Sequence, residues 1–165
     1  MDLRPVTLDD VGLYERLRCD PEMMADLGGP LPRDGIPDKV ASDVADVKAD
    51  RAWIFIVELD GTPAGHVCIW DHDEDGTRIN EIGWMVLSEF QGRGIGRDAT
   101  RLLLERARAE RRWDAVHAYP AVTNGPSNGI CRTLGFELIE ERDIEFHART
   151  LRTNHWRLDL SGQAT

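Results

Sequence analysis

A glycine-rich stretch near the middle of the chain reads Gln91-Gly92-Arg93-Gly94-Ile95-Gly96. It follows a run of β-forming residues at 79–87 and precedes a segment whose apolar residues recur at helical spacing to about residue 112. The first turn of a helix leaves backbone N–H groups without partners and carries partial positive charge. Because glycine lets an anion approach those groups closely, this strand–loop–helix segment predicts a phosphate-binding site.

Two other phosphate-binding motifs do not fit the stretch. A dinucleotide fingerprint requires a glycine three residues after Gly94, where the sequence has Arg97, and a P-loop requires Gly-Lys-Ser or Gly-Lys-Thr, which occurs nowhere. Arg93 and Arg101 lie close by in the sequence and add positive charge to the neighbourhood. From the residues alone, the alternative is a glycine-rich turn between a strand and a helix that binds no ligand.

The rest of the chain is typical of an α+β domain with a mixed sheet. Strands are expected at residues 3–8, 53–57, 64–71, 79–87, 114–119, 136–146 and 153–160. Besides the helix after the glycines, helices are expected from Thr7 or Asp9 to about 19, at 37–49 and at 126–134. Pro5 restricts the first strand to a sheet edge. The proline-rich loop at 20–38 suits a functional lid, and the acidic residues 71–76 are expected to form a loop between strands.

The composition limits the class of protein. At 165 residues, the chain fits one domain at 1–160 followed by a loose tail at 161–165. Its formal charge of −10 disfavours binding to nucleic acid and favours cationic partners. Neither a signal peptide nor a run of about 18 apolar residues is found, so no membrane association is expected. Three widely spaced cysteines suit a reducing compartment and lack metal-ligand spacing, which predicts a cytoplasmic protein without a metal site.

Two segments resemble the cofactor-binding motifs of the GCN5-related N-acetyltransferase (GNAT) superfamily. The spacing Gln91-x-x-Gly94-x-Gly96 matches the pyrophosphate motif of that family, Gln/Arg-x-x-Gly-x-Gly/Ala. Residues 124–136 are similar to its second cofactor segment, in which an Asn precedes a small residue by three and a short helix ends in Leu-Gly-Phe. The order of elements also matches over nearly the whole chain. Residues 27–30, Leu-Gly-Gly-Pro, resemble the branch related to ribosomal-protein N-terminal acetyltransferases.

This resemblance implies the GNAT fold, a mixed and mostly antiparallel sheet of about seven strands with flanking helices. It also implies transfer of an acetyl group from acetyl-CoA to a primary amine of a small molecule or a protein N-terminus, by direct attack in a ternary complex. In this family the acyl-CoA lies where the strand before the glycine loop splays from the next parallel strand. The residues at matching cofactor-binding positions are Met85, Val86, Gln91, Gly92, Arg93, Gly94, Ile95, Gly96, Asn124 and Ser127.

The resemblance further indicates catalytic candidates. Glu81 matches a carboxylate that receives the amine proton in many family members, usually through water. An amine with a pKa of about 10.4 is protonated at neutral pH and needs such a base before it can attack a carbonyl. The family commonly has a Tyr, the general acid for the departing thiolate, where this chain has Cys131. Four alternatives stay open: Cys131 as the acid, Cys131 as a buried hydrophobe with Tyr119 as the acid, water as the acid, and unassisted departure.

The acceptor pocket implied by the resemblance is lined by residues of 20–37, 64–75 and 79–85. Its candidate substrate-binding residues are Trp70, His72 and Trp84, because aromatic walls suit organic amines and cations. Since the family's Tyr is missing, the alternative function is an acyl-CoA-binding sensor that keeps the fold without turnover. Dimers are common in the family, so a homodimer is the expected alternative to a monomer.

Overall fold

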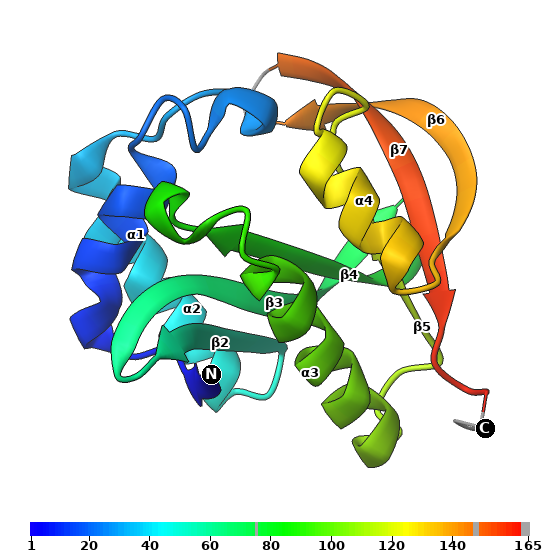
Figure 1. The fold of residues 1–165 in the computed structure, drawn as a ribbon, viewed down its shortest axis with the longest axis horizontal. Coiled ribbons are helices and arrows are strands. Elements are labelled where there is room, and N and C mark those ends of the chain that lie inside the picture. Colours follow the sequence, from blue (N-terminus) through cyan, green and yellow to red (C-terminus); the bar gives the residue numbers. More distant parts are fainter. Residues whose placement is uncertain (75, 147–148, 163–165) are drawn as a thin grey trace.

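The computed structural model describes residues 1–74, 76–146 and 149–162 (Figure 1). The described residues form one seven-stranded sheet with the strand order β1-β2-β3-β4-β5-β7-β6. Its strands are β1 (Asp2–Pro5), β2 (Ala52–Leu59), β3 (Thr62–Glu74), β4 (Thr77–Val86), β5 (Ala115–Ala118), β6 (Glu137–Phe146) and β7 (Arg149–Asp159). The α-helices are α1 (Val11–Arg18), α2 (Ile36–Lys48), α3 (Ile95–Glu110) and α4 (Gly125–Thr133). Short 3-10 helices are η1 (Leu8–Asp10), η2 (Ala25–Leu27), η3 (Arg33–Gly35) and η4 (Ser88–Phe90).

Two pairs of helices cover opposite faces of the sheet, and each pair buries its own half of the core. On one face, α3 and α4 pack on alternate residues of the central strands, Phe55 and Val67 among them. On the other face, α1 and α2 pack on the residues in between, including Ile54 and Cys68. In Figure 1, α3 and α4 lie in front of the sheet, and α2 lies behind it. The alternation of side chains along a strand therefore decides which face a residue serves.

β4 and β5 form a parallel pair, and the other neighbouring pairs of described strands are antiparallel. This mixed, mostly antiparallel sheet of seven strands with flanking helices confirms the predicted fold. β4 and β5 are in register at a single position, with Glu81 opposite His117. Toward the carboxyl ends of both strands, their described residues pair no further, and a cleft opens between them.

Pro5 lies on β1, at the edge of the sheet, as predicted from its missing N–H group. Residues 71–74 of the expected acidic loop, in contrast, belong to β3, which continues to Glu74 and pairs with β4 there, while Asp75 lies outside the described residues. Asp71 accepts a hydrogen bond from Asn80 at 2.7 Å and pairs with the guanidinium of Arg78. Partners on the facing strand thus neutralise part of the acidic charge and let the strand extend.

Candidate active site

A cleft with a volume of about 990 Å³ follows β4 and passes through the split between β4 and β5. Its loop end is lined by the glycine loop and by the first turns of α3 and α4, namely Gln91, Gly92, Gly94, Ile95, Gly96, Arg97, Asn124, Pro126 and Ser127. Its α1 end is lined by residues on the other face of the sheet, namely Arg18, Leu27, Leu31, His66, Cys68 and Trp70. Glu81 lies between the two ends, where the strands separate.

The main chain of the glycine loop turns through two left-handed glycines, Gly92 with φ of 72° and Gly94 with φ of 76°. Gly94 is the N-cap of α3, and its carbonyl accepts a hydrogen bond from the Asp98 N–H at 3.0 Å. Among the described residues, no acceptor is found for the N–H groups of residues 92–97. The loop end therefore presents consecutive main-chain donors at the positive end of a helix, an arrangement suited to a diphosphate.

Two contacts hold the glycine loop against its neighbours. Gln91 Nε2 donates to the carbonyl of Val86 at 2.8 Å, which ties the loop to the end of β4. A Cβ atom on Gly96 would lie 3.2 Å from the Cδ1 of Ile130, so this glycine lets the first turn of α3 approach α4. Ile95 is buried in the core beside them, whereas Met85 is buried on the opposite face of β4. The loop is thus fixed at both of its ends.

The two arginines of the loop differ in position. Arg93 lies over the Phe90 ring, 5.9 Å from its centroid, and its side chain is not part of the cleft wall. Arg97 lines the cleft, and its Nε pairs with Asp98 at 2.9 Å. Of these two cations, Arg97 is therefore the one that can face an anion in the cleft.

Asn124 and Ser127 begin α4 and line the loop end. The Oδ1 of Asn124 caps the helix by accepting a hydrogen bond from the Ser127 N–H at 3.0 Å. Trp84 Nε1 donates to Ser127 Oγ at 3.3 Å. Trp84 lines the cleft from the α3 and α4 side of β4, whereas Trp70 lines it from the opposite face, and a role for Trp84 in substrate binding stays a prediction.

Asn128, which the sequence analysis did not single out, fixes α4 on the sheet. Its side chain is buried, and its Nδ2 donates to the carbonyls of Ala121 at 2.9 Å and Asn124 at 2.8 Å. Its Oδ1 accepts hydrogen bonds from Asn154 Nδ2 at 2.8 Å and Trp156 Nε1 at 2.9 Å. All the hydrogen-bonding capacity of this amide is used, so the start of α4 is held at a defined place beside the cleft.

Glu81 has the most perturbed carboxyl group in the cleft. Burial raises its pKa from 4.5 to about 8, and the negative charge of Glu74 adds to the effect. A carboxylate with a raised pKa is a stronger base than an exposed one, and its pKa lies closer to that of an amine. Glu81 therefore has both the position and the basicity that proton transfer from an amine requires.

Glu74 of β3 is held in a network that reaches β6 and the residue after β5. Tyr119 donates its hydroxyl proton to Glu74 Oε2 at 2.7 Å, and Arg142 of β6 pairs with Glu74 Oε1, also at 2.7 Å. Burial and the Glu74 carboxylate both raise the pKa of Tyr119, so the hydroxyl stays protonated at neutral pH. Tyr119 lines the cleft near Glu81, and its proton is directed at Glu74.

Two histidines extend this network away from the cleft. His155 Nε2 lies 3.3 Å from the Tyr119 hydroxyl and 2.8 Å from Nδ1 of His117, the residue opposite Glu81 in the sheet. Burial lowers the pKa of both histidines, which favours their neutral forms. The contacts from Tyr119 to Glu74 and His155 join residues 45 and 36 positions apart, and no local sequence signal marks such pairs.

Trp70 lies beside Glu81, because the two residues are directly opposite each other on β3 and β4. A Cβ atom on Gly83 would lie 3.1 Å from the indole, so this glycine makes room for the ring in the cleft wall. His72 belongs to the backbone of β3, opposite Ile79, and its side chain lies outside the part of the chain that the structure describes. The structure thus places Trp70, among the three expected aromatic liners, next to Glu81.

Cys131 lies in the hydrophobic core of α4 and does not reach the cleft. Its exposed fraction is 0%, and burial raises the pKa of its thiol to about 12. The helix buries the short side chain between α3 and the sheet, which corrects its inclusion among the catalytic candidates. Of the candidates for the general acid, Tyr119 is the residue that lines the cleft.

The loop at 20–35 is anchored on both sides of the cleft. The Leu31 N–H donates to the carbonyl of Arg18 at 2.7 Å, and Thr123 Oγ1 donates to Asp26 Oδ1 at 3.0 Å. The first contact joins the loop to α1, and the second joins it to the segment before α4. The loop therefore forms part of the wall of the α1 end, as a lid would.

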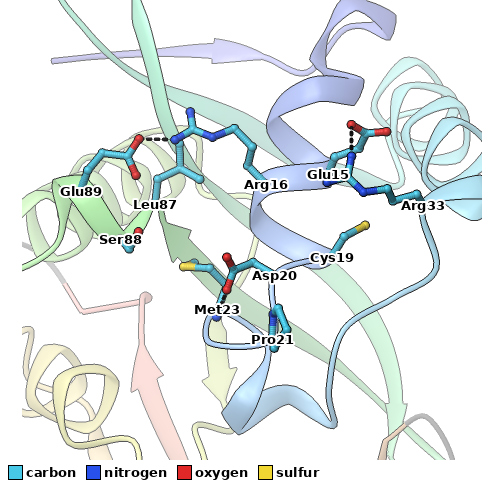
Figure 2. Close-up of a pocket in the computed structure, with 10 residues that line it drawn as sticks. All are labelled: Glu15, Arg16, Cys19, Asp20, Pro21, Met23, Arg33, Leu87, Ser88 and Glu89. Atoms are coloured by element: carbon cyan, nitrogen blue, oxygen red, sulfur yellow. Dashed lines mark hydrogen bonds and ion pairs between the residues drawn. The ribbon is translucent and has the colours of Figure 1, made fainter.

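A second, smaller pocket of about 330 Å³ lies between α1, the start of the same loop and η4 (Figure 2). Its charged side chains are paired, Arg16 with Glu89 and Arg33 with Glu15 at 3.1 Å. These pairs are exposed, and such pairs contribute little to stability. Because the glycine loop and Glu81 line the larger cleft, we place the chemistry there.

Two further findings limit the chemistry of the protein. Within residues 1–74, 76–146 and 149–162, no group of three or more His, Cys, Asp or Glu residues is arranged to hold a metal ion. In the same part of the chain, no helix is long and apolar enough to cross a membrane.

A row of main-chain donors and a buried carboxyl group, joined in one cleft at a split between parallel strands, suit an acyl-CoA-dependent transferase. Residues 1–137 match the family model described as "Acetyltransferase (GNAT) domain". The chain belongs to this GNAT family, and the protein is an acyl-CoA-dependent acetyltransferase. A search among curated protein sequences finds no match.

Several solved structures share the fold. A ribosomal-protein-alanine N-acetyltransferase from Brucella melitensis is 20% identical, with 96% of this chain and 99% of that chain covered and a TM-score of 0.79. A Salmonella typhimurium acetyltransferase that modifies the N-terminal serine of a 50S ribosomal subunit protein is 16% identical, with 95% and 93% covered and a TM-score of 0.79. The yncA protein of Salmonella typhimurium, solved with acetyl-CoA, is 20% identical, with 100% and 96% covered and a TM-score of 0.75.

Proposed function

We propose that this protein transfers an acetyl group from acetyl-CoA to a primary amine by direct attack within a ternary complex. One observation carries the proposal. A single cleft joins the main-chain N–H groups of residues 92–97 to the buried carboxyl group of Glu81. The first feature suits the diphosphate of CoA, and the second suits the deprotonation of an amine.

The cofactor would follow β4 from the loop end toward Glu81. The N–H groups of the glycine loop would hold the diphosphate, with Arg97 beside it and with Asn124 and Ser127 on the opposite wall. Main-chain groups near Met85 and Val86 would contact the pantetheine arm where β5 leaves the ladder. At about 3.3 Å per residue, Glu81 to Leu87 spans roughly 20 Å, comparable with an extended pantetheine arm. The thioester would then lie near Glu81.

In the reaction, Glu81 would accept a proton from the ammonium group of the acceptor, directly or through water. The neutral amine then attacks the thioester carbonyl, a C–N bond forms, and the C–S bond to CoA breaks. A pKa of about 8 makes Glu81 a base matched to this transfer, because burial disfavours its charged form.

For the departing thiolate, we propose no dedicated acid on α4, because Cys131 is buried. After the attack, the nitrogen loses its second proton and becomes an amide nitrogen. Because a thiol has a pKa of about 8.5, the thiolate takes up one of the two amine protons, and the other passes from Glu81 to water. We assign Tyr119 to holding Glu74 in place, since its hydroxyl donates to that carboxylate.

The acceptor would enter from the α1 end, where Trp70 and the loop at 20–35 form the wall. Two of the similar structures carry names that state acetylation of ribosomal-protein N-termini, which supports a protein N-terminus beside small amines as an acceptor. We further propose a cytoplasmic location, supported by Cys19, Cys68 and Cys131, which are all free thiols. A homodimer stays a prediction.

The proposal is tested by mixing the protein with acetyl-CoA and a panel of amines and N-terminal peptides. Release of CoA thiol is recorded, and the N-acetyl product is identified by mass spectrometry. The proposal predicts thiol and product in equal amounts with at least one amine. An acyl-CoA sensor would instead show a raised melting temperature with acetyl-CoA and no thiol release above background, and this result would contradict the proposal.

A further inference from the structure

Arg18, the last residue of α1, lines the α1 end of the cleft. Its guanidinium lies 5.9 Å from the centroid of the Tyr14 ring, and its Nη2 lies 3.5 Å from His66 Nε2. Its Nε is buried, and neither that atom nor the guanidinium as a whole is paired with a carboxylate of the described residues. A cation in a partly buried cleft wall therefore lacks a counter-anion in this part of the chain.

The nearby carboxylate that could serve Arg18 is already engaged. Asp43 Oδ2 accepts a hydrogen bond from the Tyr14 hydroxyl at 2.7 Å, and Asp43 Oδ1 pairs with the ammonium group of Lys39. His66 does not supply negative charge either, because burial keeps its imidazole neutral by lowering its pKa well below 6.5. The contact at 3.5 Å thus offers the Arg18 guanidinium a neutral imidazole and no counter-charge.

This arrangement leaves Arg18 as a cation without a carboxylate partner, although the acidic residues Asp43 and Asp46 line the same end of the cleft and pair with Lys39 and Arg51. Desolvating a cation without a partner is unfavourable, and a bound anion that accepts hydrogen bonds from the guanidinium compensates for it. Glu81, in the same cleft, instead favours a bound cation such as an ammonium group. On β3, Cys68 lies between His66, which contacts Arg18, and Trp70, which lies opposite Glu81.

We propose that the acceptor is a small amino acid, whose carboxylate is bound by Arg18 while its ammonium group faces Glu81. This inference rests on the proposed acetyl transfer at Glu81 and names the substrate class for it. The two charges of an amino acid match Arg18 at the α1 end and Glu81 at the centre of the cleft, and Trp70, opposite Glu81 on β3, lines the same cleft.

The spacing along the sheet supports this class of acceptor. His66, which contacts Arg18, lies opposite Met85, four residues from Glu81, or about 13 Å along the strand. This separation between strand positions is on the scale of a small acceptor that contacts both side chains, one of them through water.

The test compares acids with their amides. Glycine, alanine, methionine and phenylalanine are each assayed against the corresponding amide and against a tetrapeptide with the same N-terminal residue, by thiol release with saturating acetyl-CoA. We expect kcat/KM for the better free amino acids to exceed that of their amides by about 10- to 100-fold, because the amide lacks the charged acceptor. Equal or better turnover of amides or peptides would overturn the inference.

The variants Arg18→Gln and Arg18→Lys test whether the preference for free amino acids over their amides depends on the Arg18 side chain. Arg18→Gln should raise KM for the amino acid by about 10- to 100-fold and reduce the preference for acids over amides by a similar factor, and Arg18→Lys should recover part of the loss. Arg16→Gln is the matched control, because Arg16 lies on the same helix with an exposed partner in the smaller pocket. Equal losses for acids and amides in Arg18→Gln would mean a structural role and would overturn the inference.

A binding measurement separates this inference from the proposed function. Calorimetry measures how the same amino acids bind to the complex of the protein with CoA, with no acetyl transfer required. Binding that is lost in Arg18→Gln supports the carboxylate site even if no amine is acetylated, a result that would contradict only the proposed function. Acetylation of amides and peptides without any preference for acids would contradict only the amino acid inference.

Discussion

The two ends of the cleft are built from different parts of the polypeptide. The loop end consists of main-chain N–H groups from one short run, residues 92–97, together with the first turn of α4. The α1 end and the centre consist of side chains from separate elements, with Arg18 on α1, Trp70 on β3 and Glu81 on β4.

This difference has consequences for substitutions. At the loop end, the backbone conformation of single glycines decides whether the donors are accessible, so side-chain chemistry matters less there than φ. At the centre and the α1 end, burial and neighbouring charge set the properties of each side chain, so removing one charge changes its neighbours as well. The following substitutions address the two ends separately.

The largest effect is expected for Gly94→Val at the loop end. The residue has φ of 76°, which a β-branched side chain does not adopt, and a new Cβ would lie 2.9 Å from the guanidinium of Arg97. The loop must shift, and loss of two charge-assisted hydrogen bonds would weaken CoA binding by at least about 100-fold. Calorimetry with CoA measures this effect.

Two further variants control for Gly94→Val. Gly94→Asn should lose less affinity, because asparagine tolerates the left-handed region. Gly129→Ala in α4 should bind CoA like the wild type, since nothing lies within 4 Å of its added Cβ. Unchanged CoA affinity in a folded Gly94→Val protein, as judged by its melting temperature, would remove the loop from the binding site.

The next largest effect is expected for Glu81→Gln at the centre. Loss of the base should lower kcat by about 100- to 1,000-fold, while the affinity for acetyl-CoA stays within about twofold. In the wild type, kcat/KM should rise with pH to a plateau above about 8, as Glu81 loses its proton. Glu105→Gln, an exposed residue of α3, is the matched control. A pH profile that is the same in Glu81→Gln would exclude Glu81 as the base.

The same substitution should stabilise the protein at high pH. The folded state holds the Glu81 proton up to about 8 and the unfolded state only to 4.5, so the wild type loses stability as pH rises through that window. Each pKa unit corresponds to about 1.4 kcal/mol of stability. The melting temperature of Glu81→Gln should therefore lie roughly 5 °C or more above that of the wild type at pH 9, and the two melting temperatures should be equal near pH 4. A higher melting temperature for the wild type than for Glu81→Gln at pH 9 would contradict a raised pKa of Glu81 in the folded state.

A smaller effect is expected for Glu74→Gln. Removing this negative charge lowers the pKa of Glu81, so the rise in kcat/KM should move to lower pH. Burial is the larger cause of the raised pKa and is unaffected, so most of the shift should persist. The measurement is the midpoint of the pH profile, and a midpoint that moves to higher pH would contradict the electrostatic coupling.

The smallest effect on catalysis is expected for Cys131→Ala. The thiol lies in the core, so its removal should leave kcat within about twofold and lower the stability by about 1 kcal/mol, since a small cavity remains. Thermal unfolding and steady-state kinetics measure the two quantities. A large fall in kcat with unchanged KM would return Cys131 to the mechanism.

The sequence predicted features that depend on neighbouring residues. The glycine loop, the helix after it and the edge position of Pro5 follow from local rules on φ, helix termini and missing donors. The order of elements, read with the family resemblance, also indicated the split between two parallel strands.

Features that depend on distant contacts were not predictable in this way. Arg18 and His66 are 48 residues apart, and the strand that holds Glu74 extends because of partners across β3 and β4. The side chain of Trp84 packs against Ser127, 43 residues away, and Cys131 is buried by the docking of α4. Side-chain direction and burial thus had to come from the tertiary structure.

A crystal structure of the protein with CoA would test most directly whether the glycine loop and Glu81 act on the same bound cofactor. We predict diphosphate oxygens within about 3 Å of the N–H groups of residues 92–97 and the CoA sulfur in the split between β4 and β5, beside Glu81. A diphosphate bound away from this loop, or a sulfur atom that points away from Glu81, would contradict the account.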